Sequence, residues 1–273
     1  MKPAPFDYAR PATVIEAVDL LQRHAGAARV LAGGQSLGPM LNLRLAQPEL
    51  IVDIGAIGEL RQASESEEGM EIGACVTHAM FEDGRVPDVT CGLMRHVAAD
   101  IAYRAIRNRG TIGGSVCHAD PAADWLSVLI LLSARVSIVG TNGMRTLDLE
   151  HFVTGSYETA LTDDEIVVGI RVPRLPPGTR WVYYKVCRKP GEFAEAIVAA
   201  TTSVAHGRSR VVLGAIDRVP RVLEDAAFAT RRFDQGRAQE HIAAGGVEPD
   251  SYRAQICLAA IRRAARQLGA LPA

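Results

Sequence analysis

The sequence predicts a protein of mixed helices and strands that folds as two domains. Its length of 273 residues exceeds what one small core usually organises. Apolar runs alternate along the chain between strand-like and helix-like periodicity. A Pro-rich segment at 173–178 is the best candidate for a domain boundary. The apolar content of 48% and the charged content of 22% fit a soluble globular protein.

Charge and cysteine usage exclude several classes of protein. The formal net charge of −1 implies no nucleic-acid partner, and no window long enough to span a bilayer is free of charged residues. The N-terminal seven residues lack the apolar core of a signal peptide. Five scattered cysteines without a C-x-x-C pair indicate reduced thiols in the cytoplasm. An iron–sulfur cluster that served this protein would therefore lie on another chain.

The first fifty-odd residues predict a strand–helix–strand unit, followed by one more short strand. Thr13 and Glu16 have the spacing of a helix-capping box, and the apolar stripe that follows ends near Gly26. A glycine-rich turn follows the second strand. The expected strands are 6–10, 29–32 and 50–54, with a helix at 14–26 and a short element of unassigned type at 40–45.

The middle of the chain continues the mixed pattern around a polar hairpin turn at 64–69. Thr77 is the expected cap of a helix, and His78 is expected to be a surface or capping residue rather than a catalytic one. Helices are expected at 97–109 and 125–132, and strands at 70–74, 136–139, 145–147 and 165–172. Arg104, Arg107 and Arg109 either help to hold a phosphate or form a solvated helix end, which the helix dipole favours.

Beyond the Pro-rich segment the pattern predicts a small sheet followed by helices. Strands are expected at 181–186, 196–200 and 211–216, and helices at 234–243 and 251–268. The region 201–211 is short enough that one hairpin of this sheet is expected to be trimmed.

Two Gly-Gly turns carry the functional signal. Gly33-Gly34-Gln35-Ser36 follows one apolar run, and Thr111-Ile112-Gly113-Gly114-Ser115 is followed by Asp124 at the start of another. Adjacent glycines let backbone N–H groups approach a bulky anion, and the hydroxyl groups add donors. Either turn alone is typical of a tight connection before a helix. The pair suits the two halves of a pyrophosphate.

The two turns resemble those of the FAD-binding medium subunits of the molybdenum hydroxylases, the xanthine and carbon monoxide dehydrogenase superfamily. That family carries AGGxS, T-[IL]-G-G-[NS] and a downstream P-x-x-D, which match 32–36, 111–115 and 121–124 here. Residues 183–194 resemble the family's Y-x-K-x-x-R…DFA signature, with Glu192 in place of the usual Asp. No G-x-G-x-x-G or Gly-Lys-Ser/Thr motif is present, so neither a Rossmann dinucleotide fold nor a P-loop is predicted.

The resemblance implies an α+β fold in which two lobes of the vanillyl-alcohol oxidase (PCMH) type grip an extended FAD, with the pyrophosphate on loops rather than on one helix N-terminus. The implied FAD-binding domain covers 1–175, with lobes at about 1–55 and 56–175. Residues 176–273 are expected to form a C-terminal carbon monoxide dehydrogenase flavoprotein-like domain, a small antiparallel sheet with helices.

The resemblance also implies a set of cofactor-binding residues and no catalytic or metal-binding residue on this chain. Asp124 matches a carboxylate near the adenine-side ribose, whereas Val167 and Lys185 match positions at the isoalloxazine end. Alternatively, Lys185 pairs with Glu192 or Glu195. The implied FAD contacts are Leu31, Ala32, Gly33, Gly34, Gln35, Ser36, Leu37, Gly38, Ile101, Thr111, Ile112, Gly113, Gly114, Ser115, Asp124, Val167 and Lys185.

The function implied by the resemblance is electron transfer in a heteromeric complex. FAD on this chain would accept electrons from two [2Fe–2S] clusters of a small subunit and pass them to an external electron acceptor. A large subunit would carry the molybdenum–molybdopterin cofactor, in a dimer of heterotrimers. Two alternatives are a free-standing oxidase of the vanillyl-alcohol oxidase type with its own substrate site, and a scaffold subunit that has lost FAD. Cys117 is expected to be a small buried apolar substitute, and His118 with Asp120 to support the loop.

Overall fold

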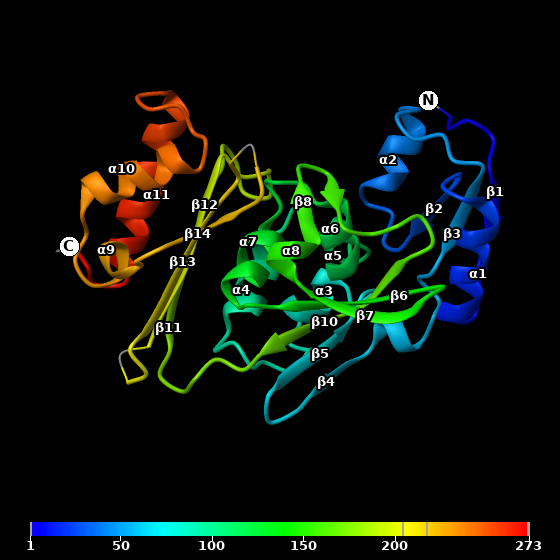
Figure 1. Ribbon diagram of the computed structural model, residues 1–273, viewed down its shortest axis with the longest axis horizontal. Helices are drawn as coiled ribbons and strands as arrows, with labels where there is room; N and C mark the ends of the chain where they lie inside the picture. The colour runs from blue at the N-terminus through cyan, green and yellow to red at the C-terminus, as the bar shows by residue number, and fades with distance from the viewer. Residues whose placement is uncertain (1, 204, 217, 272–273) are drawn as a thin grey trace.

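The computed structural model describes residues 2–203, 205–216 and 218–271. The three larger sheets follow one another along the longest axis, from the N-terminal sheet at the right of Figure 1 to the C-terminal sheet at the left, and a two-stranded sheet of β8 and β9 accompanies them. The central and C-terminal sheets are antiparallel, the N-terminal sheet is parallel, and helices pack beside all of them, so the predicted α+β class is confirmed. No helix of these residues combines the length and apolar character needed to cross a membrane.

The N-terminal lobe is a three-stranded parallel sheet with one long helix. Its strands lie in the order β1 (Asp7–Ala9), β3 (Leu50–Asp53) and β2 (Ala28–Leu31). The helix α1 (Val14–His24) begins where predicted, because the Thr13 side chain accepts the Glu16 N–H and the Glu16 carboxylate accepts the Ala12 N–H. A short helix α2 (Leu37–Asn42) follows β2 and starts three residues earlier than the expected element.

The central lobe is a five-stranded antiparallel sheet covered by short helices. The strands lie in the order β4 (Ala63–Glu65), β5 (Gly69–Gly73), β10 (Ile166–Pro173), β6 (Arg135–Gly140) and β7 (Gly143–Asp148). The other elements are η1 (Glu59–Arg61), α3 (His78–Glu82), α4 (Leu93–Asp100), α5 (Arg104–Arg107), α6 (Ile112–His118), α7 (Asp124–Leu131), α8 (Leu149–Phe152), β8 (Val153–Gly155) and β9 (Glu158–Thr159).

The single helix expected at 97–109 is wrong, because the chain breaks between α4 and α5. Ala102 has a φ of 45°, in the left-handed region that an alanine rarely adopts. Ile101, after the last residue of α4, and Tyr103, before the first residue of α5, both have an extended backbone, so no continuous helical face runs through them. The break also leaves the Ile101 and Ala102 carbonyl groups outside the helical hydrogen-bond pattern. The Arg107 guanidinium donates a hydrogen bond to each of them.

The C-terminal sheet has α7 on one face and α11 on the other (Figure 1). Its strands β11 (Arg180–Val186), β12 (Ala196–Ser203), β13 (Arg208–Gly214) and β14 (Arg221–Leu223) are antiparallel. Three helices follow: α9 (Ala227–Thr230), α10 (Gln235–Ala244) and α11 (Tyr252–Gln267). The predicted strands and the two long helices are confirmed. The short elements β14 and α9 were not predicted, since neither has a clear period.

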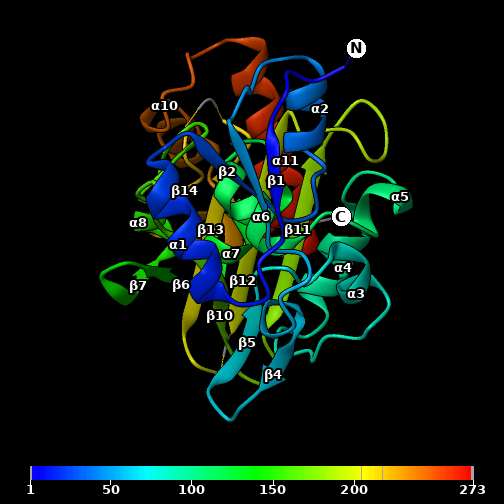
Figure 2. The same cartoon turned by 90° about the vertical axis from the view of Figure 1, so that its right-hand side faces the viewer.

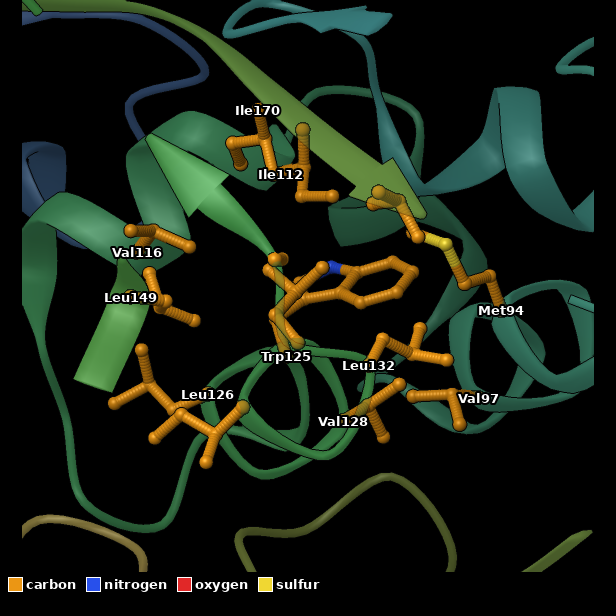
Figure 3. Packing of buried hydrophobic residues seen from close by; sticks show 14 of the residues in the cluster. Met94, Val97, Ile112, Val116, Trp125, Leu126, Val128, Leu132, Leu149 and Ile170 are labelled. Carbon is orange, nitrogen blue, oxygen red and sulfur yellow. The ribbon is translucent and has the colours of Figure 1, made fainter. Parts of the chain in front are cut away.

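The largest core surrounds Trp125 on α7. Every residue of this helix is buried, and Figure 3 shows the indole packed among Ile112, Met94 and Leu132. The same core includes Ile197 of β12, so the central lobe and the C-terminal sheet share one apolar interior. Residues on both sides of the Pro-rich segment therefore contribute to the packing that positions α7.

Candidate functional site

A cavity of about 960 Å³ opens between the three parts of the molecule. The N-terminal lobe lines it mainly with 29–37, the central lobe with His78, residues between 101 and 124 and β10, and the C-terminal part with Lys185 and 191–193. Figure 2 looks from the N-terminal side and shows α6 behind the β1–β3–β2 sheet. The volume lies in the range of small-molecule sites, about 300–1,000 Å³.

The first Gly-Gly turn connects β2 to α2 and needs both glycines. Gly34 has a φ of +73°, which favours a residue without a side chain. A Cβ at Gly33 would lie 2.1 Å from the Arg109 carbonyl oxygen, so no other residue fits there without movement. Arg109 also donates from Nε to the Gly33 carbonyl at 3.3 Å. These contacts bring the first turn directly against the residues that precede the second.

The backbone amides of the first turn are available to a ligand. The N–H groups of Gly33, Gly34, Gln35 and Ser36 donate to no acceptor within the described ranges. All four residues line the cavity. Successive unpaired N–H groups in a tight turn form a concavity that binds anions. This turn therefore has the donors that a phosphate group requires.

The second Gly-Gly stretch has a different local structure from the one expected. It is not an open turn but the first turn of α6, with Thr111 as the N-cap. The amides of Ile112 and Gly113 donate to Val76 and Ala74 at 3.0 Å, and the Gly114 amide donates to Thr111 Oγ1 at 3.1 Å. Neither glycine has a positive φ.

Close packing explains the glycines of this second stretch. A Cβ at Gly113 would lie 2.5 Å from the Ala74 side chain, and one at Gly114 would lie 2.8 Å from Thr111 Oγ1. Because the amides are already paired, the donors left for a ligand here are the hydroxyl groups of Thr111 and Ser115, both on the cavity wall.

Asp124 and Lys185 form a buried ion pair at the cavity wall. The Lys185 ammonium lies 2.9 Å from Asp124 Oδ1, and the Tyr183 hydroxyl donates to the same oxygen at 2.5 Å. Both charged side chains are less than a tenth exposed. Burial raises the pKa of Asp124, while the lysine charge and the tyrosine hydrogen bond oppose that shift. Burial and the neighbouring carboxylate raise the pKa of Tyr183 well above its usual value.

This pair corrects two expectations from the sequence. Asp124 and Lys185 cannot serve opposite ends of an extended cofactor, because their charged atoms are in contact. The alternative pairing of Lys185 with Glu192 or Glu195 is also wrong. Those two carboxylates face Arg188 instead.

His78 is buried rather than superficial, which corrects another expectation. It begins α3 as predicted, but only 5% of its surface is exposed. Its Nδ1 accepts the Trp125 indole N–H at 3.0 Å, so this nitrogen carries no proton. Burial, with the nearby Arg107 charge, lowers its pKa from 6.5 to about 4. The ring is therefore neutral near pH 7 and supports the floor of the cavity beside Gly110.

The three arginines before the second stretch do not line the cavity, which argues against direct phosphate contacts. Arg104 and Arg107 lie in the last turn of α5, and Arg104 and Arg109 are exposed, as expected for a solvated helix end. Arg104 pairs with Glu82 and Asp83 at 2.7 Å. Arg107 forms a two-bond pair with Glu82. Arg109 contacts the first turn through its backbone and side chain.

Most of the predicted cofactor contacts gather on one cavity. The exceptions are Gly38, which lies within α2, and Ile112, which is fully buried in the Trp125 core (Figure 3). Sequence reasoning missed Tyr103, Tyr157 and Phe193 as wall residues, although they are exposed aromatic side chains beside predicted contacts. Cys117, His118 and Asp120 also line the cavity, and burial raises the pKa of Cys117 to about 12, which keeps its thiol neutral.

The residues present fit FAD. Four free amides and two hydroxyls suit a diphosphate, and an elongated wall with apolar side chains such as Ile101 and Val167 suits flat rings. A side chain at Gly34 would enter a conformation that only glycine adopts easily, so the turn keeps its backbone open to the cavity.

Comparison with known proteins agrees with this geometry. Residues 4–175 match the family model described as the FAD binding domain in molybdopterin dehydrogenase. The chain is 35% identical over 226 residues to the nicotine 6-hydroxylase medium subunit of Paenarthrobacter nicotinovorans, covering 81% of this chain and 79% of that one. It is 40% identical over 196 residues to the carbon monoxide dehydrogenase medium chain of Hydrogenophaga pseudoflava, covering 72% and 68%.

Solved structures give the same result over the whole chain. A carbon monoxide dehydrogenase from Hydrogenophaga pseudoflava superimposes with a TM-score of 0.90 at 34% identity, covering 99% of each chain. Quinoline 2-oxidoreductase from Pseudomonas putida 86 superimposes with a TM-score of 0.88 at 31% identity, covering 100% of each. The chain therefore belongs to the molybdenum hydroxylase family, as an FAD-binding medium subunit of its oxidoreductases.

Proposed function

We propose that this chain is the electron-transfer subunit of a heteromeric molybdenum hydroxylase. It accepts electrons from [2Fe–2S] clusters on a small partner subunit and passes them to an external acceptor. A large partner subunit carries the molybdenum–molybdopterin cofactor, and the complex is a dimer of heterotrimers. The observation that carries the proposal is one cavity lined both by Gly33 to Ser36, whose amides donate to no acceptor among the described residues, and by Thr111 and Ser115. When bound there, FAD supplies the redox chemistry, which no side chain provides.

The chain's own residues bind and orient the cofactor. The amides of the first turn and the hydroxyls of α6 hold the diphosphate. Ile101 and Val167 supply apolar walls that exclude water. The Lys185–Asp124 pair presents a fixed, nearly neutral charge pair at the wall, and Tyr183 holds the carboxylate in place.

Two titratable groups buried at the wall, His78 and Asp124, are committed to structural partners. His78 accepts a hydrogen bond from Trp125, and Asp124 is shared between Tyr183 and Lys185. Their geometry favours holding a cofactor over acid–base work on a substrate. The relatives are named for nicotine, carbon monoxide and caffeine, a spread expected if a large partner subunit selects the substrate.

Reoxidation kinetics of the complex test this proposal. We expect the complex purified with this chain to hold one FAD per chain and to reoxidise its reduced clusters rapidly with oxygen, NAD⁺ or a water-soluble quinone, tried separately. The Gly34→Val complex should keep its clusters, lose FAD and reoxidise at least tenfold more slowly. Equal rates with and without FAD would contradict the electron-transfer role. Failure to co-purify any iron–sulfur chain would contradict the subunit role.

A further inference from the structure

Arg107 touches the cavity wall from behind without lining the cavity. Its Nη1 donates to the carbonyl oxygens of Ile101 and Ala102 at 3.0 and 2.9 Å. Its Nε and Nη2 donate to the two carboxylate oxygens of Glu82 at 2.8 and 2.9 Å. The side chain is only 11% exposed. One planar guanidinium therefore joins the end of α3 to the break between α4 and α5.

The geometry of this contact depends on arginine. A guanidinium presents its N–H groups in a rigid fork. Two of its nitrogens can therefore donate to a carboxylate, while the two N–H groups of the third nitrogen reach two carbonyl oxygens on the other side. A lysine ammonium in the same place is a compact point charge on a flexible stem and does not span both partners. Glu82 also accepts a hydrogen bond from Arg104 at 2.7 Å, so this carboxylate keeps one arginine partner when either arginine is replaced.

The segment held in this way shapes two walls of the cavity. Ile101, Ala102 and Tyr103 line one wall directly. A Cβ at Gly191 would lie 2.8 Å from the Ala102 carbonyl oxygen, so the 187–195 connection packs tightly on this segment. That connection adds Glu192 and Phe193 to the adjoining wall. Because Ala102 has a φ of 45°, the break needs external contacts to keep its shape.

We propose that Arg107 is a positioning residue for the bound cofactor. By fixing the Ile101 and Ala102 carbonyls, it keeps the wall formed before the cofactor arrives, which lowers the ordering cost of binding. This inference rests on the proposed function, in that FAD is taken as the occupant. Arg107, next to the second glycine stretch, thus acts on the cofactor through the backbone and not by touching its phosphates.

The test compares Arg107→Met and Arg107→Lys with a matched control, Arg104→Met. Arg104 shares the partner Glu82, but no hydrogen bond joins it to the 101–103 segment among the described residues. All variants are made in the full chain and purified with whatever partner subunits accompany it. FAD is removed and then titrated back, and the dissociation constant is followed by flavin fluorescence. Hydrogen exchange of the backbone amides at 101–107 is measured on the FAD-free protein.

We expect Arg107→Met to raise the dissociation constant for FAD at least tenfold and Arg107→Lys to fall in between. Arg104→Met should stay within twofold of the wild type. Exchange at 101–107 should accelerate in Arg107→Met and not in Arg104→Met. Equal losses in both methionine variants, or unchanged affinity in Arg107→Met, would overturn the positioning role.

Failure of the proposed function and failure of the positioning role of Arg107 give different results in these two measurements. If the wild-type protein itself binds no FAD, the function is wrong, whereas the exchange comparison still decides whether Arg107 holds the segment. If the wild type binds FAD and the exchange rates of the two methionine variants agree, the function stands and the role of Arg107 is wrong.

Discussion

Single residues around the cavity are held by specific partners. His78 is an example, because both its hydrogen bond and its protonation state are set by its surroundings. Its Nδ1 must stay unprotonated to accept the Trp125 N–H at 3.0 Å, and burial penalises the charged ring. The histidine therefore ties the first residue of α3 to the central core. The sequence did not predict this hydrogen bond, because its partner Trp125 lies 47 residues further along the chain than His78.

Protonation of His78 should make the folded state less stable in mild acid. The folded pKa of about 4 lies below the unfolded value of 6.5, so the unfolded chain binds the extra proton between these values. Stability is therefore full above pH 6.5 and falls as the pH drops toward 4, with a loss of about 2 kcal/mol between pH 7.5 and pH 5. Urea unfolding at the two pH values, followed by Trp125 fluorescence, measures this loss.

The control for this prediction is His78→Gln, which keeps an acceptor near the indole and removes the titrating ring. Its free energy of unfolding should be lower than the wild type's at pH 7.5 and should change less between the two pH values. If the wild type and the variant lose equal stability from pH 7.5 to pH 5, another group is responsible and the assignment to His78 is wrong.

At the scale of elements, the strands and the long helices follow from sequence periodicity, whereas the breaks between short helices do not. The Thr13 cap and the apolar stripe predicted α1, and the apolar run at 196–200 predicted β12. The break at Ala102 was missed because its left-handed φ is stabilised by Arg107 and Gly191, which local sequence does not reveal. Tertiary contacts override propensity at such positions.

The two glycine stretches were predicted as equivalent and are not. The first offers free amides and contains the positive φ of Gly34, while the second uses its amides within the protein. A motif specifies residue types but not which amides remain unpaired. Only part of the cavity-lining set could thus be predicted from the motifs, and the ion pair of Asp124 with Lys185 depends on how α7, which packs on β12 and β13, meets β11.

Substitutions at the glycines should therefore separate binding from folding. Gly34→Val forces a branched residue into a left-handed conformation, at a cost of roughly 1–2 kcal/mol, and crowds the free amides. Gly114→Val places its side chain against the Thr111 hydroxyl that caps α6. We expect both variants to fold, with unchanged far-ultraviolet circular dichroism, and to be purified without FAD, as measured by flavin absorbance.

Gly38→Ala is the matched control for the glycine variants. Its Cβ would meet nothing within 4 Å, its φ is not positive, and it lies within α2, outside the cavity wall. It should retain one FAD per chain and gain up to about 1 kcal/mol of stability, because alanine is the better helix former. Full flavin content in Gly34→Val and Gly114→Val would show that the glycine stretches do not hold the cofactor.

At the scale of the whole molecule, the N-terminal lobe, the central lobe and the C-terminal sheet all contribute walls to the cavity. A bound cofactor therefore connects these three parts, which otherwise contact one another through two different apolar cores. The central lobe and the C-terminal sheet already share the Trp125 core, whereas the N-terminal lobe packs on the central lobe through a second apolar cluster, which joins Val18 and Val52 to Ile166 of β10. The turn at 33–36 is one of the parts of that lobe that line the cavity, and it packs against Arg109 of the central lobe. Cofactor binding should therefore stabilise the N-terminal lobe most of all.

Thermal unfolding tests this link between the occupant and the lobes. A ligand at one hundred times its dissociation constant stabilises the folded state by about 2.7 kcal/mol, which raises Tm by roughly 5–10 °C in a chain of this size. We expect FAD to produce this shift in calorimetry of the wild type and none in Gly34→Val. Because the diphosphate joins the first turn to α6, the N-terminal lobe should unfold together with the rest when FAD is bound. A separate early transition that does not move with FAD would mean that the lobe contributes nothing to the site.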